Sequence, residues 1–275
     1  MTKVNKNLEL KKYINDYCKA KKISKNELAT QIGVNGAYLS KIETEKFDDI
    51  ADEMLNKIRS AITRLTVDDV LETTDLASVF ALCDKTRKYR LMTGLTADTG
   101  MGKTTALKRY SFRQNVFYVT VGKAMTAKRL LVSILRAMNV SFDGSIHDIV
   151  VRIADELNRL ENPLLIIDEA GKLTHNMLLY LHDLREYTLT NCGVILSGMP
   201  YFRMNLQKAA DCQREGCAEF LRRINLWHKM SGLSKSEIDL VCHHNGIQSQ
   251  KSWYGLRFAD LMNQILLEKI KNEND

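Results

Sequence analysis

The chain has 275 residues, which is room for about two domains of roughly 150 residues each. Hydrophobic residues make up 45% and charged residues 27%, a globular composition that excludes a disordered chain. No run approaches the ~18 apolar residues of a membrane span, and the start of the chain lacks an export signal, so transmembrane and secreted classes are excluded. With six scattered cysteines we expect reduced thiols and a cytoplasmic protein without a membrane partner.

The net charge of +7 is distributed unevenly. Residues 1–46 carry ten lysines against five acids, and residues 47–75 carry three basic residues against eight acids. Residues 85–136 carry twelve Lys or Arg against the single acid Asp98. Two basic blocks indicate two places where a polyanion could dock, although lysine-rich helices are often merely solvated, so the interpretation depends on motifs.

The N-terminal segment predicts three helices. The first covers residues 8–20. Ser24 and Glu27 have the spacing of a capping box and open a short helix over residues 27–32, which Gly33 ends. A further helix is expected to begin two residues after the glycine turn. Short helix, turn and short helix is the spacing of a helix-turn-helix.

This segment resembles the helix-turn-helix of phage repressors. The small Ala29 lies where the two helices must approach, and Leu39 and Ile42 anchor the second helix. In that family the second helix enters the major groove of DNA. The resemblance implies four DNA-contacting residues: Asn35, Tyr38, Ser40 and Lys41. A helical hairpin used for protein contacts is the alternative.

The strongest motif runs from residue 97 to residue 105 and reads Ala97-Asp98-Thr99-Gly100-Met101-Gly102-Lys103-Thr104-Thr105. It follows a predicted strand over residues 91–95 and opens a predicted helix over residues 104–112. This is the Walker A pattern, in which backbone N–H groups and a helix N-terminus hold phosphates. We expect ATP and Mg²⁺ to bind here, with Lys103 on the β and γ phosphates and Thr104 on the metal. The nucleotide-binding residues are Gly100, Gly102, Lys103, Thr104 and Thr105, whereas Ala97 replaces the first glycine of the pattern.

A second motif lies 65 residues after Lys103. Between the two motifs, residues 116–121 predict a buried parallel strand, and helices are expected over residues 127–138 and 146–160. The motif itself has four apolar residues, 164–167, that lead into Asp168 and Glu169. This is the Walker B arrangement: Asp168 belongs to the Mg²⁺ shell, and Glu169 orients or activates the attacking water.

Further polar residues continue the order of motifs found in AAA+ ATPases, which residues 90–270 resemble. A predicted strand over residues 193–196 ends at Ser197, at the place of the sensor 1 residue. Arg222 or Arg223 would be the finger that reaches a neighbouring subunit's γ-phosphate. Arg257 lies at the place of sensor 2, between predicted lid helices over residues 235–242 and 258–270.

An AAA+ ATPase behind a repressor-type helix-turn-helix is similar to the MuB family of transposition proteins and their TnsC-type relatives. The resemblance implies an α/β fold, namely a P-loop NTPase with a parallel sheet and a small helical lid, preceded by an all-α domain. It also implies an ATPase that DNA stimulates, an ATP-dependent homo-oligomer in the form of a helical filament or ring, and binding to double-stranded DNA with little sequence preference. A DDE-type transposase would receive this DNA. Non-specific capture needs phosphate contacts, for which the candidates are Lys123, Lys128 and Arg129, with Lys172 as a secondary one.

The expected domains are a helix-turn-helix domain over residues 1–64, a linker helix over 65–89, an ATPase core over 90–232 and a lid over 233–275. Three other classes stay open. They are an ATP-gated transcription regulator, a helicase-loader-type AAA+ protein, and a simple P-loop enzyme acting on a small molecule.

Overall fold

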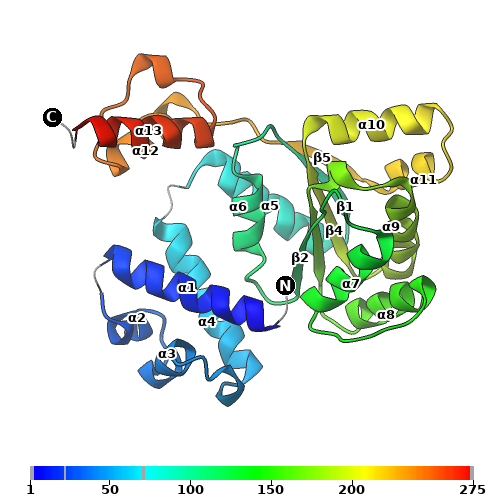
Figure 1. The fold of residues 1–275 in the computed structure, drawn as a ribbon, viewed down its shortest axis with the longest axis horizontal. Helices are drawn as coiled ribbons and strands as arrows, with labels where there is room; N and C mark the ends of the chain where they lie inside the picture. The colour runs from blue at the N-terminus through cyan, green and yellow to red at the C-terminus, as the bar shows by residue number, and fades with distance from the viewer. Residues whose placement is uncertain (1–2, 22, 70–71, 273–275) are drawn as a thin grey trace.

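The computed structural model describes residues 3–21, 23–69 and 72–272. These residues form an N-terminal group of helices, a central sheet covered by helices, and a C-terminal pair of helices (Figure 1). The N-terminal group and the C-terminal pair both lie on the side of the sheet that carries α5 and α6 (Figure 1). Across the described ranges, none of the helices is both long enough and apolar enough to span a bilayer.

The N-terminal group is all helical. It consists of α1 (Lys3–Lys21), α2 (Lys25–Gln31), α3 (Gly36–Glu43), the 3-10 turn η1 (Phe47–Asp49) and α4 (Asp52–Asp69). Apolar side chains from all four α-helices form one cluster, which includes Ile14, Leu28 and Leu55. The group therefore has a core of its own, separate from the core of the sheet.

The connection between α2 and α3 has the geometry that the sequence predicts. Ser24 and Glu27 cap α2 reciprocally: Glu27 N donates to Ser24 Oγ at 3.2 Å, and Ser24 N donates to Glu27 Oε2 at 2.6 Å. Gly33 turns the chain with a φ of +66°, in the left-handed region that favours glycine. Ala29 and Leu39 are buried between the helices. The predicted pair of short helices is confirmed.

The centre of the molecule is a sheet of five parallel strands in the order β2-β3-β4-β1-β5. The strands are β1 (Met92–Thr96), β2 (Val116–Thr120), β3 (Leu164–Asp168), β4 (Gly193–Gly198) and β5 (Leu226–Lys229). The three inner strands β3, β4 and β1 are buried along their whole length because helices cover both faces of a parallel sheet. β5 is an edge strand with half-buried residues, and its short mixed sequence gave no strand signal.

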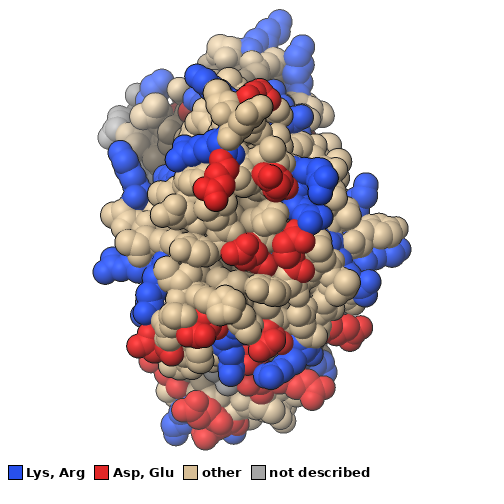
Figure 2. All heavy atoms as spheres, turned by 90° about the vertical axis from the view of Figure 1, so that its right-hand side faces the viewer, with Lys and Arg blue, Asp and Glu red and all other residues tan. Residues whose placement is uncertain are grey.

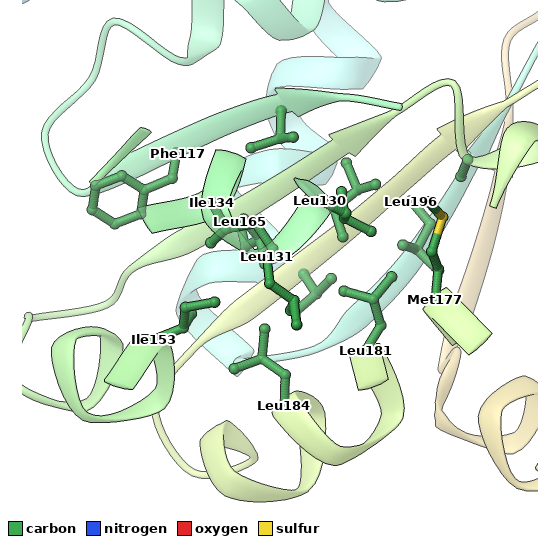
Figure 3. Close-up of a cluster of buried hydrophobic side chains, with 14 of the residues drawn as sticks. Phe117, Leu130, Leu131, Ile134, Ile153, Leu165, Met177, Leu181, Leu184 and Leu196 are labelled. Atoms are coloured by element: carbon green, nitrogen blue, oxygen red, sulfur yellow. The ribbon is translucent and has the colours of Figure 1, made fainter. Parts of the chain in front are cut away.

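Helices on the two faces of the sheet bury separate apolar clusters. One face carries α5 (Thr74–Tyr89) and α6 (Lys103–Tyr110). The other face carries α7 (Ala127–Ala137), α8 (Ile146–Asn158), α9 (His175–Thr188), α10 (Pro200–Asp211) and α11 (Cys217–Arg223). Figure 3 shows the second cluster, in which Leu131, Leu165 and Leu181 come from a helix, a strand and another helix.

Surface charge on the α8–α11 side of the molecule is mixed. In the view of Figure 2, acidic side chains lie mostly across the middle and lower part, and basic side chains lie mainly around the rim. This face therefore presents no continuous basic surface to a polyanion.

The C-terminal part consists of α12 (Lys235–His244), the 3-10 turn η3 (Lys251–Trp253) and α13 (Phe258–Asn272). Its buried residues, among them Ile238, Trp253 and Leu261, form a small cluster of their own. These are the two helices that the sequence predicts for the lid.

The region expected as one linker helix over residues 65–89 differs from that expectation. α4 runs to Asp69, and a separate helix, α5, begins at Thr74 after the Thr73 N-cap. Val79 and Cys83 of α5 are fully buried against the sheet, so α5 packs as part of the central fold. An apolar stripe of this kind binds a helix to the sheet because its burial is more favourable than exposure to water.

Candidate nucleotide-binding site

The loop between β1 and α6 turns with two glycines in the left-handed region. Gly100 has a φ of +82°, and Gly102, the N-cap of α6, has a φ of +88°. No described atom lies within 4 Å of the position that a Cβ of Gly102 would take. The start of α6 therefore has an open N-terminus, where unpaired backbone N–H groups favour an anion. Ala97, in place of the first glycine of the pattern, directly follows β1 and is fully buried.

Lys103 folds back over this loop. Its Nζ donates to the carbonyl oxygens of Ala97 at 2.6 Å and Asp98 at 2.9 Å, and the residue is 8% exposed. Burial lowers the pKa of the Lys103 ammonium, and the nearby charge of Asp168 partly offsets this effect. Two neutral carbonyl oxygens thus hold the ammonium in the loop. A negatively charged phosphate oxygen would be a stronger acceptor for it.

Asp168, at the carboxyl end of β3, is 1% exposed and accepts three hydrogen bonds. Thr104 Oγ1 and Tyr118 OH both donate to its Oδ2 at 2.7 Å, and the backbone N–H of Glu169 donates to its Oδ1 at 2.9 Å. Burial and the charge of Asp168 raise the pKa of Tyr118, so the phenol stays protonated and donates at neutral pH. The buried carboxylate is therefore satisfied by donors from α6, β2 and its own turn.

These residues fit a nucleotide with its Mg²⁺. The hydroxyl of Thr104 and the carboxylate of Asp168 are hard oxygen ligands of the kind that Mg²⁺ prefers, and they already lie at hydrogen-bonding distance. Lys103 supplies a positive charge at the same loop. Glu169 follows directly, with a φ of +59°, and its Oε2 lies 3.2 Å from Lys172 Nζ in an ion pair.

Ser197 lies on β4, between the strand of Asp168 and the strand that leads into the P-loop. Its side chain is fully buried, and its Oγ has no hydrogen-bond partner in the described chain. Burying a hydroxyl without a hydrogen-bond partner costs free energy. The unpaired hydroxyl of Ser197, near the edge where the three strands end, therefore favours a polar ligand there.

The two candidate finger arginines lie on the other face of the sheet from α6. They end α11, whose Phe220 belongs to the cluster on the α7–α11 face. Arg223 Nε makes an ion pair of 2.5 Å with Glu186 Oε1. The exposed Arg222 has no side-chain partner in the described residues. Neither arginine contacts the P-loop of its own chain in the described ranges. The structure therefore brings the Walker A and Walker B residues Thr104 and Asp168 into contact but not the two finger candidates.

The C-terminal pair touches the P-loop. The N–H of Ala259 donates to the carbonyl oxygen of Gly100 at 2.9 Å. Arg257, two residues earlier, makes an ion pair with Asp260 at 2.7 Å and is exposed. The structure therefore places Arg257 near the loop, with its guanidinium on its own helix.

A pocket lies between the P-loop, the first turn of α5 and the C-terminal pair. Its lining is mostly apolar and comprises Thr73, Asp75, Leu76, Met101, Gly102, Thr105, Ala106, Arg109, Met230, Gly232, Leu233 and Phe258. Asp75 fixes one wall, since its two carboxylate oxygens accept the N–H groups of Ser231 and Gly232 at 2.8 Å each. An apolar pocket beside a phosphate-binding loop is suited to a flat base.

Sequence reasoning identified neither Asp75 nor Tyr118 as part of the site. Tyr118 did carry a signal, because a buried tyrosine in an otherwise apolar parallel strand needs a partner for its hydroxyl. For Asp75, the sequence carries no such signal beyond its position near the start of a helix.

The four lysine and arginine candidates for phosphate contacts lie at one edge of the sheet. Lys123 follows β2, Lys128 and Arg129 lie in the first turn of α7, and Lys172 follows β3. The carboxyl ends of parallel neighbours lie together, so these residues share an edge with Asp168. Lys128 also makes a long ion pair of 3.4 Å with Asp143.

The four N-terminal residues predicted to contact DNA differ in how far their side chains are free to do so. Ser40 is exposed, and Asn35 uses its side-chain oxygen to cap α3 by accepting from Ala37 N at 2.9 Å. Lys41 donates to the carbonyl oxygen of Asp49 at 3.2 Å, and Tyr38 is half-buried against the N-terminal core. Three of the four side chains are thus engaged within their own group of helices, and in the described ranges only Ser40 is not.

The sheet order, the glycine loop and the Thr104–Asp168 pair define the fold: the chain has the AAA+ P-loop NTPase fold, and the expected α/β class is confirmed. A family profile described as an AAA domain matches residues 86–206. No curated protein matches the chain by sequence.

Three solved structures are similar to the chain at low identity, and the first of them shows the same fold. The ORC1 protein of Aeropyrum pernix, solved in complex with DNA, is 14% identical with a TM-score of 0.52, over 73% of this chain and 60% of that one. Drosophila ORC bound to AT-rich DNA and Cdc6 is 15% identical with a TM-score of 0.38, over 60% of this chain and 61% of that one. The Walker-type ATPase PABY2304 of Pyrococcus abyssi is 13% identical with a TM-score of 0.44, over 67% of this chain and 61% of that one. This chain spans about three fifths of the length of each of them.

Proposed function

We propose that this chain is an ATP-dependent DNA-binding protein that oligomerises on double-stranded DNA and delivers it to a DDE-type transposase, which it stimulates. The observation that carries the nucleotide part is the 2.7 Å hydrogen bond from Thr104 to Asp168 beside Lys103. A P-loop hydroxyl and a strand-end carboxylate in contact are the two protein ligands that hold Mg²⁺ in this class.

The residues would divide the ATPase work as follows. Lys103 and the N-terminus of α6 bind the phosphates. Thr104 and Asp168 would hold Mg²⁺, which when bound neutralises charge on the β and γ phosphates. Glu169 positions the attacking water and accepts its proton, and Ser197 offers its hydroxyl at the same edge. The pocket over Phe258 and Leu233 takes the base.

Oligomerisation would complete the site. Arg222 is exposed, has no partner in the described part of its own chain, and lies on the opposite face of the sheet from α6. We propose that it serves a neighbouring copy, where its charge would stabilise the transition state of phosphoryl transfer. ATP would thereby join protomers, and hydrolysis would release them.

Two features of this chain and one similar structure support DNA binding. Lys123, Lys128 and Arg129 offer positive charge at the sheet edge beside Asp168, and α2, the Gly33 turn and α3 have the spacing that a helix-turn-helix would need. The structure of similar fold from Aeropyrum pernix is an ORC1 protein in complex with DNA. A few phosphate contacts for each protomer would add along an oligomer, so weak contacts would suffice.

The second candidate is a helicase-loader-type AAA+ protein. The shared fold with a DNA-bound ORC1 fits any AAA+ protein that acts on DNA and does not identify the protein that receives it. An ATP-gated transcription regulator would instead need a discrete operator for α3.

The test is a DNA-binding titration of the full chain at several salt concentrations, with ATP and Mg²⁺. We expect the double variant Lys128→Ala, Arg129→Ala to bind DNA more weakly and to lower the slope of log K against log salt by about 2. The control pair Lys208→Ala, Arg214→Ala removes the same charge from α10 and the turn after it and should leave the slope unchanged. Equal slopes for the first variant and wild type would place the DNA path elsewhere.

A nuclease footprint and a pull-down separate the candidates. Long uniform protection supports target capture, and a discrete palindromic site supports a regulator. Stimulation of a DDE-type transposase supports the first candidate, and stable binding of a hexameric helicase supports the second.

A further inference from the structure

We propose that Tyr118 is a positioning residue of the metal site, which holds the Asp168 carboxylate in place for Mg²⁺ through its hydroxyl. This inference rests on the proposed nucleotide function and adds a residue that no P-loop motif includes. The geometry, not the sequence pattern, points to it.

The position of Tyr118 follows from the sheet register. β2 and β3 are parallel neighbours, with Tyr118 opposite Ile166 and Thr120 opposite Asp168. Tyr118 therefore starts two residues before the level of the carboxylate, and its long side chain reaches along the sheet to Asp168 Oδ2 at 2.7 Å. The residue is 5% exposed, so water does not replace this contact.

The direction of the hydrogen bonds is fixed by chemistry. An ionised carboxylate only accepts, so the Tyr118 hydroxyl must donate to Asp168. The oxygen of that hydroxyl in turn accepts a bond of 3.2 Å from Thr120 Oγ1. The result is a directed chain from Thr120 through Tyr118 to Asp168, which leaves Tyr118 no freedom to turn its donor elsewhere.

Tyr118 differs in kind from the other side chain on the same oxygen. Thr104 also donates to Asp168 Oδ2 at 2.7 Å, but Thr104 is itself a proposed ligand. Tyr118 is not a proposed ligand, so it is free to hold Asp168 from behind while Thr104 and Asp168 face the metal. Partners behind a metal ligand orient it, and their loss typically lowers metal affinity about 10- to 100-fold.

The chain offers a matched control in Tyr110. This tyrosine is also buried, and its hydroxyl donates to Asp84 Oδ1 at 2.5 Å. Tyr110 lies at the end of α6, away from the P-loop, and Asp84 is exposed on α5. Tyr110→Phe therefore removes an equivalent buried hydroxyl and a bond to a carboxylate without touching Asp168.

The experiment measures binding of a fluorescent ATP analogue to the full chain, first in EDTA and then as Mg²⁺ is added. We expect Tyr118→Phe to bind the analogue in EDTA within twofold of wild type. The Mg²⁺ concentration at which the analogue reaches half of its gain in affinity, here called the Mg²⁺ midpoint, should rise about tenfold or more in Tyr118→Phe. Tyr110→Phe should keep the wild-type midpoint.

A second variant protects the test against misfolding. Thr120→Val removes the hydroxyl that orients Tyr118 at an exposed position, and it should raise the Mg²⁺ midpoint by a smaller factor. An unchanged midpoint in folded Tyr118→Phe, or in Thr120→Val if Tyr118→Phe does not fold, would overturn this inference alone. Failure of the wild-type chain to bind the analogue under any condition would overturn the proposed function and the inference with it.

Discussion

The backbone N–H of Ala259 donates a hydrogen bond of 2.9 Å to the carbonyl oxygen of Gly100. This bond joins the first turn of α13 to the middle of the P-loop. A Cβ at Gly100 would come within 3.0 Å of the Cβ of Ala259. The position of the C-terminal helices and the shape of the P-loop are therefore coupled.

Gly100→Ala tests this coupling. The φ of +82° disfavours a side chain, so we expect the free energy of unfolding to fall by about 1–2 kcal/mol. The added methyl should also push against Ala259 and weaken nucleotide binding. Gly246→Ala is the control, because Gly246 has a φ of +73° with no described atom near its missing Cβ. Urea melts and nucleotide titrations measure both effects, and wild-type nucleotide affinity in Gly100→Ala would contradict the coupling.

Lys103→Ala should lower nucleotide affinity about 10- to 100-fold or more, since a hydrogen bond to a charged group is lost. Only the protonated ammonium attracts phosphate, and burial lowers the pKa of Lys103. Wild-type affinity should therefore begin to fall, as the pH is raised, below the pH at which an exposed lysine titrates. Lys103→Ala should show no such fall. Lys85→Ala, an exposed lysine on α5, is the control. An affinity of Lys103→Ala equal to wild type would remove Lys103 from the site.

Glu169→Gln should bind ATP but hydrolyse it about 100-fold more slowly, because an amide cannot accept the proton of the attacking water. Slow hydrolysis should also lengthen the lifetime of DNA complexes. The readouts are steady-state phosphate release and the dissociation rate from DNA. Glu161→Gln, at an exposed position, should match wild type. Unchanged hydrolysis in Glu169→Gln would assign the base elsewhere.

Arg222→Ala should retain ATP binding and lose hydrolysis about a thousandfold. Mixing it with Lys103→Ala should restore part of the activity, because one variant keeps a working P-loop and the other keeps the arginine. Arg223→Ala should instead lose its half-exposed ion pair with Glu186, at about 0.5–1 kcal/mol of stability, and keep most activity.

The mixing experiment separates a finger from a merely structural arginine. Partial recovery in the mixture places Arg222 in the site of a neighbour. Full activity of Arg222→Ala alone, or no recovery in a mixture with folded Lys103→Ala, would contradict that role.

Local patterns predicted much of the fold. The run of β-branched and aromatic residues predicts β2, the four apolar residues before Asp168 predict β3, and the capping box at Ser24 and Glu27 predicts the start of α2 within two residues. The α/β class followed from the order of the glycine loop and the acidic strand end. These features depend on neighbours in sequence, which is why a single sequence reveals them.

Features that depend on distant contacts were not predictable. β5 becomes a strand only because β1 pairs with it, and Trp227 on it packs against Gly94, where a Cβ would lie 2.3 Å from the indole. The sequence predicts α5 as part of a linker because the residues that bury it belong to the sheet. All five strands of that sheet follow α5 in sequence, so no local pattern shows the contact. The contact between Tyr118 and Asp168 depends on a strand register that no local spacing encodes.

Sedimentation of the full chain with long double-stranded DNA tests the central claim, that a nucleotide held by one copy is completed by its neighbour. With ATP and Mg²⁺ present, wild type should form large, fast-sedimenting complexes, and Arg222→Ala should form few. A wild-type chain that sediments as a monomer whether or not ATP, Mg²⁺ and DNA are present would contradict the account.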